Sequence, residues 1–103
     1  MPVCLVVNLW LKGDDVAGFE AFERAAAEIM TKHGGRIEHV VRRSEPGDGP
    51  FEMHVVTFPS EAALGAYRAD PLLKELAPLR ERVIARTEIW RGEQRPAYFE
   101  TRR

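Results

Sequence analysis

The spacing of apolar residues changes along this chain in a set order, and that order constrains the fold more than any other feature of its 103 residues. Four short segments have the apolar or alternating pattern of strands: residues 3–11, 36–43, 51–58 and 82–90. Between the first two, the apolar residues of segment 15–33 recur every three or four positions, as on one face of a helix. Residues 61–69 and 72–79 predict a second helical region, disturbed at Pro78. The predicted order is therefore β-α-β-β-α-β.

Residue types at the ends of the helical segments support these boundaries. Asp14 or Asp15 can accept the free amide protons at the start of the first helix. Gly34, just after it, can adopt the left-handed conformation that ends a helix. Ser60 and Asp70 stand where caps of the later helices would lie. Both ends of the first helix are thus marked in the sequence.

The order of these segments is that of a split β-α-β arrangement. It gives a four-stranded antiparallel sheet with the helices on one face. We therefore predict an α+β, ferredoxin-like βαββαβ fold for residues 1–91, followed by a C-terminal tail at 92–103. The seven-residue loop 44–50 lets Arg43 pair with Phe51, although a bulge would change which residues share a face.

Side chains alternate along a strand, so each strand divides into odd-numbered and even-numbered residues. The odd-numbered sets are mostly aliphatic in all four strands, and we expect them to lie under the helices. We expect these even-numbered residues on the uncovered face: Cys4, Val6, Asn8, Trp10, Arg36, Glu38, Val40, Arg42, Glu52, His54, Val56, Phe58, Ile84, Arg86, Glu88 and Trp90. Because soluble monomers avoid large exposed apolar patches, this mixture predicts a homodimer whose two sheet faces enclose a partly polar pocket. A simply solvated face is the alternative.

Charge and cysteine content exclude several classes of function. Lys and Arg number 15 against 16 Asp and Glu, a net charge of −1, whereas nucleic-acid binding usually needs a basic stripe. The single cysteine, Cys4, excludes an internal disulfide and fits a reducing compartment, so we expect the cytoplasm. The apolar run 3–7 is far shorter than the roughly 20 residues that span a bilayer, and we expect no membrane partner.

The candidate site follows from the expected uncovered face. His54 lies in the middle of a predicted central strand and is the hypothetical general base, with Asn8 as the amide beside it. The expected ligand-binding residues are Trp10, Arg42, Phe58, Arg86, Glu88 and Trp90. In the alternative interpretation, the same polar residues form a hydrogen-bonded network across the dimer interface.

Other residue types give weaker signals. His33, His39 and His54 are the only imidazoles, and their spacing does not predict a zinc site. Cys4 is best explained as a small buried residue, since no neighbouring motif would activate its thiol. Tyr98 and Phe99 either hold the tail against a partner subunit or belong to a disordered end.

Several short motifs together resemble a known group of proteins: Lys32-His33-Gly34-Gly35-Arg36, Phe58-Pro59-Ser60-Glu61-Ala62-Ala63, Tyr67 with Asp70-Pro71, and Leu79-Arg80. They are similar to short bacterial proteins of the dimeric α+β barrel superfamily, mainly of unknown function, which also includes the antibiotic-biosynthesis monooxygenases. The resemblance runs from about Phe19 to Arg91. It implies a homodimer and, by analogy with the monooxygenases, oxygen chemistry without a cofactor in a pocket using Asn, Trp and Arg. A haem ligand role for His54 is a further alternative within this superfamily.

The sequence thus leaves two classes of function open. In the first, the chain binds a small organic molecule in a sheet-face pocket, as a binding protein or as a cofactor-independent, monooxygenase-like enzyme. In the second, it is a structural or regulatory dimer with no catalytic activity. A sizeable pocket lined by Asn8, His54 and Trp90 would favour the first class.

Overall fold

The helices and strands follow the predicted order. A computed structural model describes the chain from residue 1 to residue 98. The elements are β1 (Val3–Leu11), α1 (Val16–Lys32), β2 (Arg36–Arg42), β3 (Glu52–Phe58), α2 (Glu61–Ala69), α3 (Pro71–Glu75), α4 (Ala77–Val83) and β4 (Ile84–Gly92). Phe99, part of the predicted tail contact, lies outside the described residues. The βαββαβ plan is therefore confirmed, with the second helical region divided into three short helices.

The predicted helix boundaries hold because the capping groups are where the sequence places them. The carboxylate of Asp15 accepts a hydrogen bond from the backbone N–H of Gly18 at 2.8 Å and caps α1. Gly34 follows α1 with a positive φ of 80°, which a residue with a side chain rarely adopts. Pro78 stands in the first turn of α4, where its missing N–H costs nothing. Because α4 continues to Val83, β4 begins two residues later than the predicted 82.

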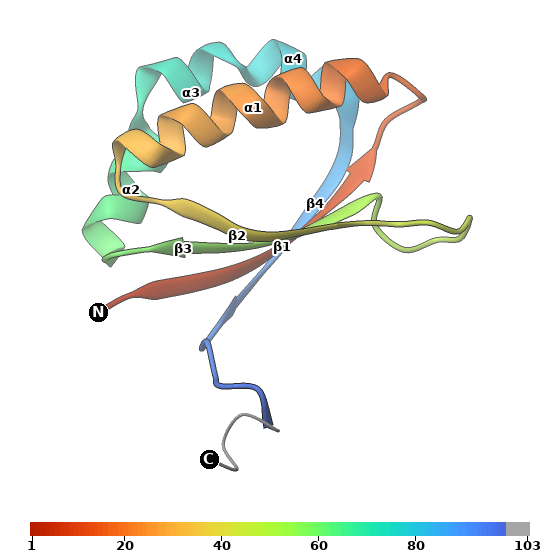
Figure 1. Ribbon diagram of the computed structural model, residues 1–103. Coiled ribbons are helices and arrows are strands. Elements are labelled where there is room, and N and C mark those ends of the chain that lie inside the picture. The colour runs from red at the N-terminus through yellow and green to blue at the C-terminus, as the bar shows by residue number, and fades with distance from the viewer. Residues whose placement is uncertain (99–103) are drawn as a thin grey trace.

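The four strands form one antiparallel sheet in the order β2-β3-β1-β4, so β1 and β3 are central. All of the helices cover the same face of this sheet, as Figure 1 shows. The hydrophobic core lies between the two layers, where Phe19 and Val83 from the helices and Phe58 from β3 are almost completely buried. The uncovered face, opposite the helices, carries the side chains that point away from this core.

One prediction about the sheet is wrong. The odd-numbered residues of β1 face the helices, as predicted. In the register between β1 and β3, however, these odd-numbered residues lie opposite even-numbered ones: Leu5 pairs with Val56, and Val7 pairs with His54. Residues directly opposite each other in a sheet project to the same side, so the even-numbered residues of β3 lie under the helices. Glu52 and His54 are buried there, with 6% and 4% of their surface exposed. Met53 is correspondingly on the uncovered face.

A bulge changes the faces of β2 in the same way. The register between β2 and β3 shifts between Ile37 and His39, so Glu38 and His39 both lie on the uncovered face. Beyond this point Val40 pairs with His54 and Arg42 with Glu52, which turns both β2 side chains toward the helices. The predicted pairing near the hairpin loop is confirmed, since the Arg43 N–H donates to the Phe51 carbonyl at 3.0 Å.

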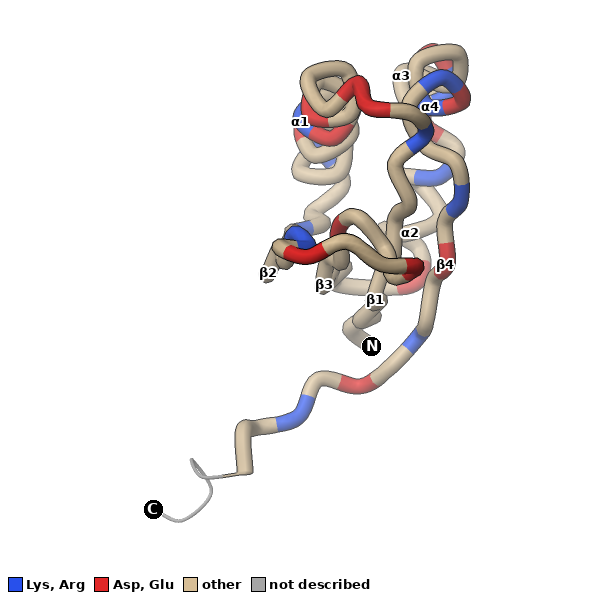
Figure 2. Tube along the Cα trace, turned by 90° about the vertical axis from the view of Figure 1, so that its right-hand side faces the viewer, with Lys and Arg blue, Asp and Glu red and all other residues tan. Residues whose placement is uncertain are grey.

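The segment that follows β4 extends away from the sheet. Figure 2 shows the described part of the tail leading away from the sheet on the side opposite the helices. Within residues 1–98, no helix has the length and apolar character needed to cross a membrane. The division into a domain at 1–91 and a tail at 92–103 stays a prediction.

Candidate functional site

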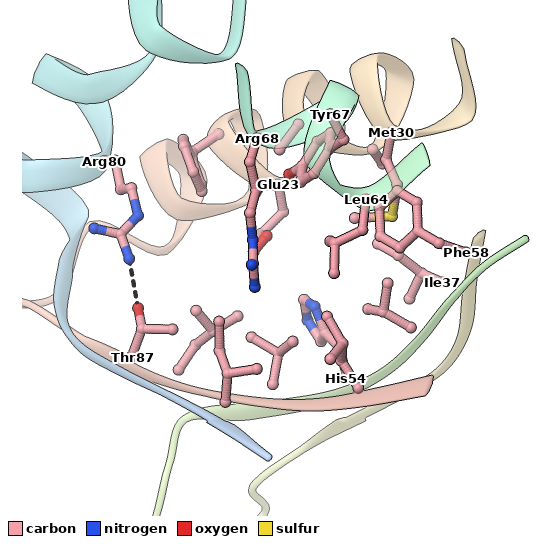
Figure 3. Close-up of a pocket in the computed structure, with 18 residues that line it drawn as sticks. Glu23, Met30, Ile37, His54, Phe58, Leu64, Tyr67, Arg68, Arg80 and Thr87 are labelled. Carbon is pink, nitrogen blue, oxygen red and sulfur yellow. Dashed lines mark hydrogen bonds between the residues drawn. The ribbon is translucent and has the colours of Figure 1, made fainter. Parts of the chain in front are cut away.

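A cavity of about 160 Å³ lies between the sheet and the helix layer, on the covered face (Figure 3). Most of its wall is apolar, with contributions from Leu5, Val7, Phe22, Met30, Phe58 and Leu64. Its polar lining residues come from five different elements: Glu23, His54, Tyr67, Arg68, Arg80 and Thr87. The fold therefore gathers several ionisable groups in a mainly hydrophobic space.

His54 forms part of the floor of the cavity and is held there by a chain of charged groups. Its Nε2 lies 2.8 Å from Oε1 of Glu52, and both side chains are buried. The other carboxylate oxygen of Glu52 accepts a hydrogen bond from Nε of Arg42 at 2.7 Å. Arg42 in turn reaches Glu20 of α1 at 3.0 Å. Such a carboxylate partner fixes the orientation of an imidazole ring.

Above His54, two helices contribute groups whose ionisation is disfavoured. Burial raises the pKa of the Glu23 carboxyl, an effect that nearby His54 partly opposes. Burial also raises the pKa of Tyr67 to about 12, and the charge of Glu23 adds to this shift. The carboxyl of Glu23 and the phenol of Tyr67 are therefore both held toward their neutral forms inside the cavity.

The cavity opens beside β4, at its solvent-exposed lining residues. These residues are Arg68 of α2, Arg80 of α4 and Ile89 of β4. The guanidinium of Arg80 donates from Nη2 to Oγ1 of Thr87 at 2.7 Å, and this bond ties α4 to β4 (Figure 3). Arg68 extends from α2 down toward the floor of the cavity in the same view.

The predicted site residues divide between the two faces of the sheet. Five of them lie on the uncovered face: Asn8, Trp10, Arg86, Glu88 and Trp90. In the register between β1 and β4, Asn8 pairs with Glu88, Trp10 pairs with Arg86, and Trp90 pairs with Val6. Arg86 lies over the Trp10 ring at 4.4 Å from its centroid and forms an ion pair with Glu88. The structure brings these five together as the alternation predicts, but no described cavity is lined by Asn8 or Trp90.

The other three predicted residues lie on the covered face, against the prediction. His54 and Phe58 line the cavity, whereas Arg42 contacts Glu52 and Glu20 and is not among the lining residues. The cause is the register between β1 and β3 together with the bulge in β2, which no local pattern reveals. His54 and Asn8 therefore cannot act on one ligand within a single chain, because the sheet separates them.

Sequence reasoning also missed the helical part of the site. Glu23 and Tyr67 line the cavity, and neither is among the predicted site residues. Yet Glu23 is one position after Phe22 and four after Phe19, which places it beside the buried stripe of α1. An acidic residue at such a position is the sequence signal that could have identified the cavity.

No protein-family model and no curated protein matches the chain. Solved structures do match. A dabb family protein with a ferredoxin-like fold from Mesorhizobium loti superposes with a TM-score of 0.68 at 15% identity, over 92% of this chain and 98% of that chain. The chain has a ferredoxin-like fold.

Two further solved structures are similar to the chain. SnoaB, a cofactor-independent oxygenase from Streptomyces nogalater, has a TM-score of 0.71 at 15% identity, over 94% of this chain and 96% of that chain. A dimeric protein of unknown function from Bacteroides fragilis has a TM-score of 0.61 at 14% identity, over 90% and 96%. At these identities the likeness establishes the ferredoxin-like fold, while chemistry has to be argued from the site.

Proposed function

We propose that the cavity between the helices and the sheet binds a small organic molecule and that His54 accepts a proton from it. The observation that carries this proposal is the setting of His54. The imidazole lines an otherwise apolar floor, and its Nε2 is held by the buried carboxylate of Glu52. Within residues 1–98 its Nδ1 makes no hydrogen bond, so this atom is available to a ligand.

The size of the cavity indicates the size of the molecule. An apolar cavity of about 150 Å³ in another protein accommodates benzene. A cavity of about 160 Å³ with an open side therefore accepts a benzene ring that carries a few further atoms, as a substituent or as a small fused ring. The apolar walls would bury the ring, and the few polar groups would orient it.

Proton removal leaves a negative charge on the ligand, which the cavity can stabilise. His54 becomes a cation beside the Glu52 carboxylate, and the pair is favourable in that state. Arg80 and the neutral phenol of Tyr67 are hydrogen-bond donors that line the same space. The site therefore has a base and donors for an oxyanion, as enolisation of a carbonyl compound requires.

2-Indanone, a compact ketone with acidic C–H bonds, tests this proposal. Its α-hydrogens should exchange with D₂O faster in the presence of the protein than in buffer alone, as followed by NMR. His54→Gln should slow the catalysed exchange by about 100-fold or more. His39→Gln is the matched control, because His39 lies on the uncovered face, and it should exchange at the wild-type rate. Equal rates for wild type and His54→Gln would refute the role of His54.

Cofactor-independent oxygenation is a second candidate, supported by the fold shared with SnoaB. An electron-rich carbanion in a water-poor cavity is the form in which an organic molecule can react directly with O₂. In such a reaction a CH₂ group becomes a carbonyl, one oxygen atom enters the product and the other leaves as water. The substrate itself supplies all of the electrons.

An oxygen electrode and ¹⁸O₂ labelling distinguish the two candidates. Oxygenation of 2-indanone would consume one O₂ for each 1,2-indanedione formed and would place one ¹⁸O atom in the product. Proton exchange without O₂ uptake would support the proton-transfer function and exclude oxygenation of this probe.

The uncovered face supports a homodimer through the sheets. Val41, Met53 and Trp90 are 57%, 38% and 64% exposed there, although they are large and apolar. Oδ1 of Asn8 is buried without a hydrogen-bond partner in the described residues, which a donor from a second copy would correct. The matching ferredoxin-like protein from Bacteroides fragilis is dimeric.

Sedimentation at micromolar concentration tests the dimer. The wild-type protein should have twice the chain mass of 11.7 kDa, and Trp90→Arg should shift it toward the monomer. Leu72→Arg, at a 50% exposed residue on the helical side, is the control and should remain dimeric. A monomeric wild type would refute this assembly. A dimer that binds no small molecule would favour a structural or regulatory role instead.

A further inference from the structure

The arginines at the mouth of the cavity differ from most others in the chain. Six arginines lie within 4.0 Å of a glutamate side chain: Arg24, Arg36, Arg42, Arg86, Arg91 and Arg95. Within residues 1–98, Arg68 and Arg80 have no carboxylate at this distance, although they come from different helices and line one cavity. Two guanidinium groups without an acidic partner at one opening form an electropositive entrance.

These two side chains line the same cavity. Nη2 of Arg80 is bound to Thr87, which positions the guanidinium while leaving its other N–H groups available. Arg68 points from α2 toward the interior of the cavity in Figure 3. The planar N–H array of arginine matches the two oxygens of a carboxylate, and such charged hydrogen bonds are among the strongest in proteins.

The cavity contains little negative charge that could pair with these two arginines. Among the described lining residues Glu23 is the one acid, and its pKa is raised mainly by burial. Its carboxyl is therefore held toward neutrality, although the nearby charge of Arg80 partly opposes this shift. The deeper wall, formed by Leu64, Met30 and Phe58, is apolar. The mouth of the cavity therefore suits a charged group of a ligand, and the interior suits a hydrocarbon group.

We propose that the natural ligand is a small aromatic or alicyclic carboxylic acid whose carboxylate binds Arg68 and Arg80 and whose ring lies against Leu64 and Phe58. This inference rests on the proposed function, because it specifies the class of molecule that the same cavity binds. It places the ionised group toward solvent and the reactive part of the ligand near His54.

Benzoate and benzamide form a matched pair of probes, since they have nearly the same shape and differ in charge. We expect benzoate to bind at least tenfold more tightly than benzamide by calorimetry, with NMR shifts at cavity residues. Arg68→Gln and Arg80→Gln should each remove most of this preference. Both residues are solvent-exposed, and circular dichroism would verify that the variants fold. Arg82→Gln on the same helix as Arg80 is the control, because Arg82 does not line the cavity.

The outcomes separate this inference from the proposed function. If benzamide binds the cavity as tightly as benzoate, the carboxylate inference is wrong and the binding function stands. If Arg82→Gln weakens benzoate binding as much as Arg80→Gln, general positive charge explains the preference and the specific contact is refuted. If benzoate, benzamide and 2-indanone all fail to shift any cavity resonance, both proposals fail.

Discussion

Oε1 of Glu52 lies 2.8 Å from Nε2 of His54, although the two residues are only two positions apart on one strand. A carboxylate only accepts hydrogen bonds, so this contact assigns a proton to Nε2 and leaves Nδ1 as the acceptor. Arg42 binds the same carboxylate and holds its charge in a buried position. The arrangement prepares His54 to accept a proton from the cavity, and it makes Glu52 important for stability as well.

Replacing Glu52 with alanine should destabilise the fold. The substitution removes the partner of a buried imidazole and of Arg42, and an unsatisfied buried polar group costs about 1–3 kcal/mol. Chemical denaturation followed by circular dichroism measures the free energy of unfolding. Glu88→Ala is the control, because Glu88 and Arg86 are both more than a third exposed and such pairs contribute about 0–1 kcal/mol. If Glu52→Ala and Glu88→Ala lowered the free energy of unfolding equally, the stabilising role of the buried network would be contradicted.

The phenol of Tyr67 should ionise only near pH 12, because burial and the charge of Glu23 oppose the phenolate. The chain has two tyrosines, so Tyr98→Phe leaves Tyr67 as the single phenol. Ultraviolet absorbance then reports its titration directly. Since the pKa is raised in the folded state, this group's contribution to stability is complete below its ordinary value of 10.0 and is lost as the pH rises toward 12. Ionisation near pH 10 without unfolding would show that Tyr67 is solvated.

Asp70 should make the fold sensitive to acid. Its carboxylate binds Lys32 at 2.6 Å and His33 at 2.7 Å, and it accepts the Leu72 N–H at 2.9 Å. These contacts, Lys32 first, hold the pKa of Asp70 well below its ordinary value of 3.8. A lowered folded-state pKa contributes stability above the ordinary value, and this contribution is lost as the pH falls through and below it.

The variant Asp70→Asn tests this origin of acid sensitivity. It should be less stable at neutral pH and should lose less further stability between pH 5 and pH 2 than the wild type does. Asp14→Asn, at an exposed loop position, should retain the wild-type pH profile. Parallel pH profiles for wild type and Asp70→Asn would show that the contacts at Asp70 contribute nothing.

Gly35 should not tolerate alanine. A methyl group at this position would lie 2.6 Å from Cε1 of the buried Phe58 and would also contact Met30. Overpacking of this kind typically costs about 1–3 kcal/mol. Gly65→Ala provides the control, because nothing lies within 4 Å of the added carbon in the middle of α2. There alanine should stabilise the helix by up to about 1 kcal/mol, as thermal unfolding would measure.

The local elements could be predicted because their causes are local. The boundaries of α1 follow from the Asp15 cap and from Gly34, which the sequence shows directly. The uncovered position of Asn8, Trp10, Arg86, Glu88 and Trp90 could also be predicted, since β1 keeps its apolar residues inward and pairs regularly with β4 as far as Trp10. The prediction is wrong for Ile84, because the register shifts after Trp10 and Ile84 is buried in the core. The candidate base was identified for its residue type and its central strand, but its surroundings were not.

The face on which His54 lies depends on a relationship between strands. A period of two residues determines which side chains of β3 share a face, and it leaves open which of those faces meets the helices. Met53 and Val55, the aliphatic residues at odd-numbered positions of β3, favoured the wrong face. The tertiary structure buries Glu52 and His54 instead, because Arg42 of β2 donates to the Glu52 carboxylate and that carboxylate in turn binds His54. The sequence by itself thus determined the order and the ends of the elements, whereas the strand register and the bulge in β2 decided where the cavity and its charged groups lie.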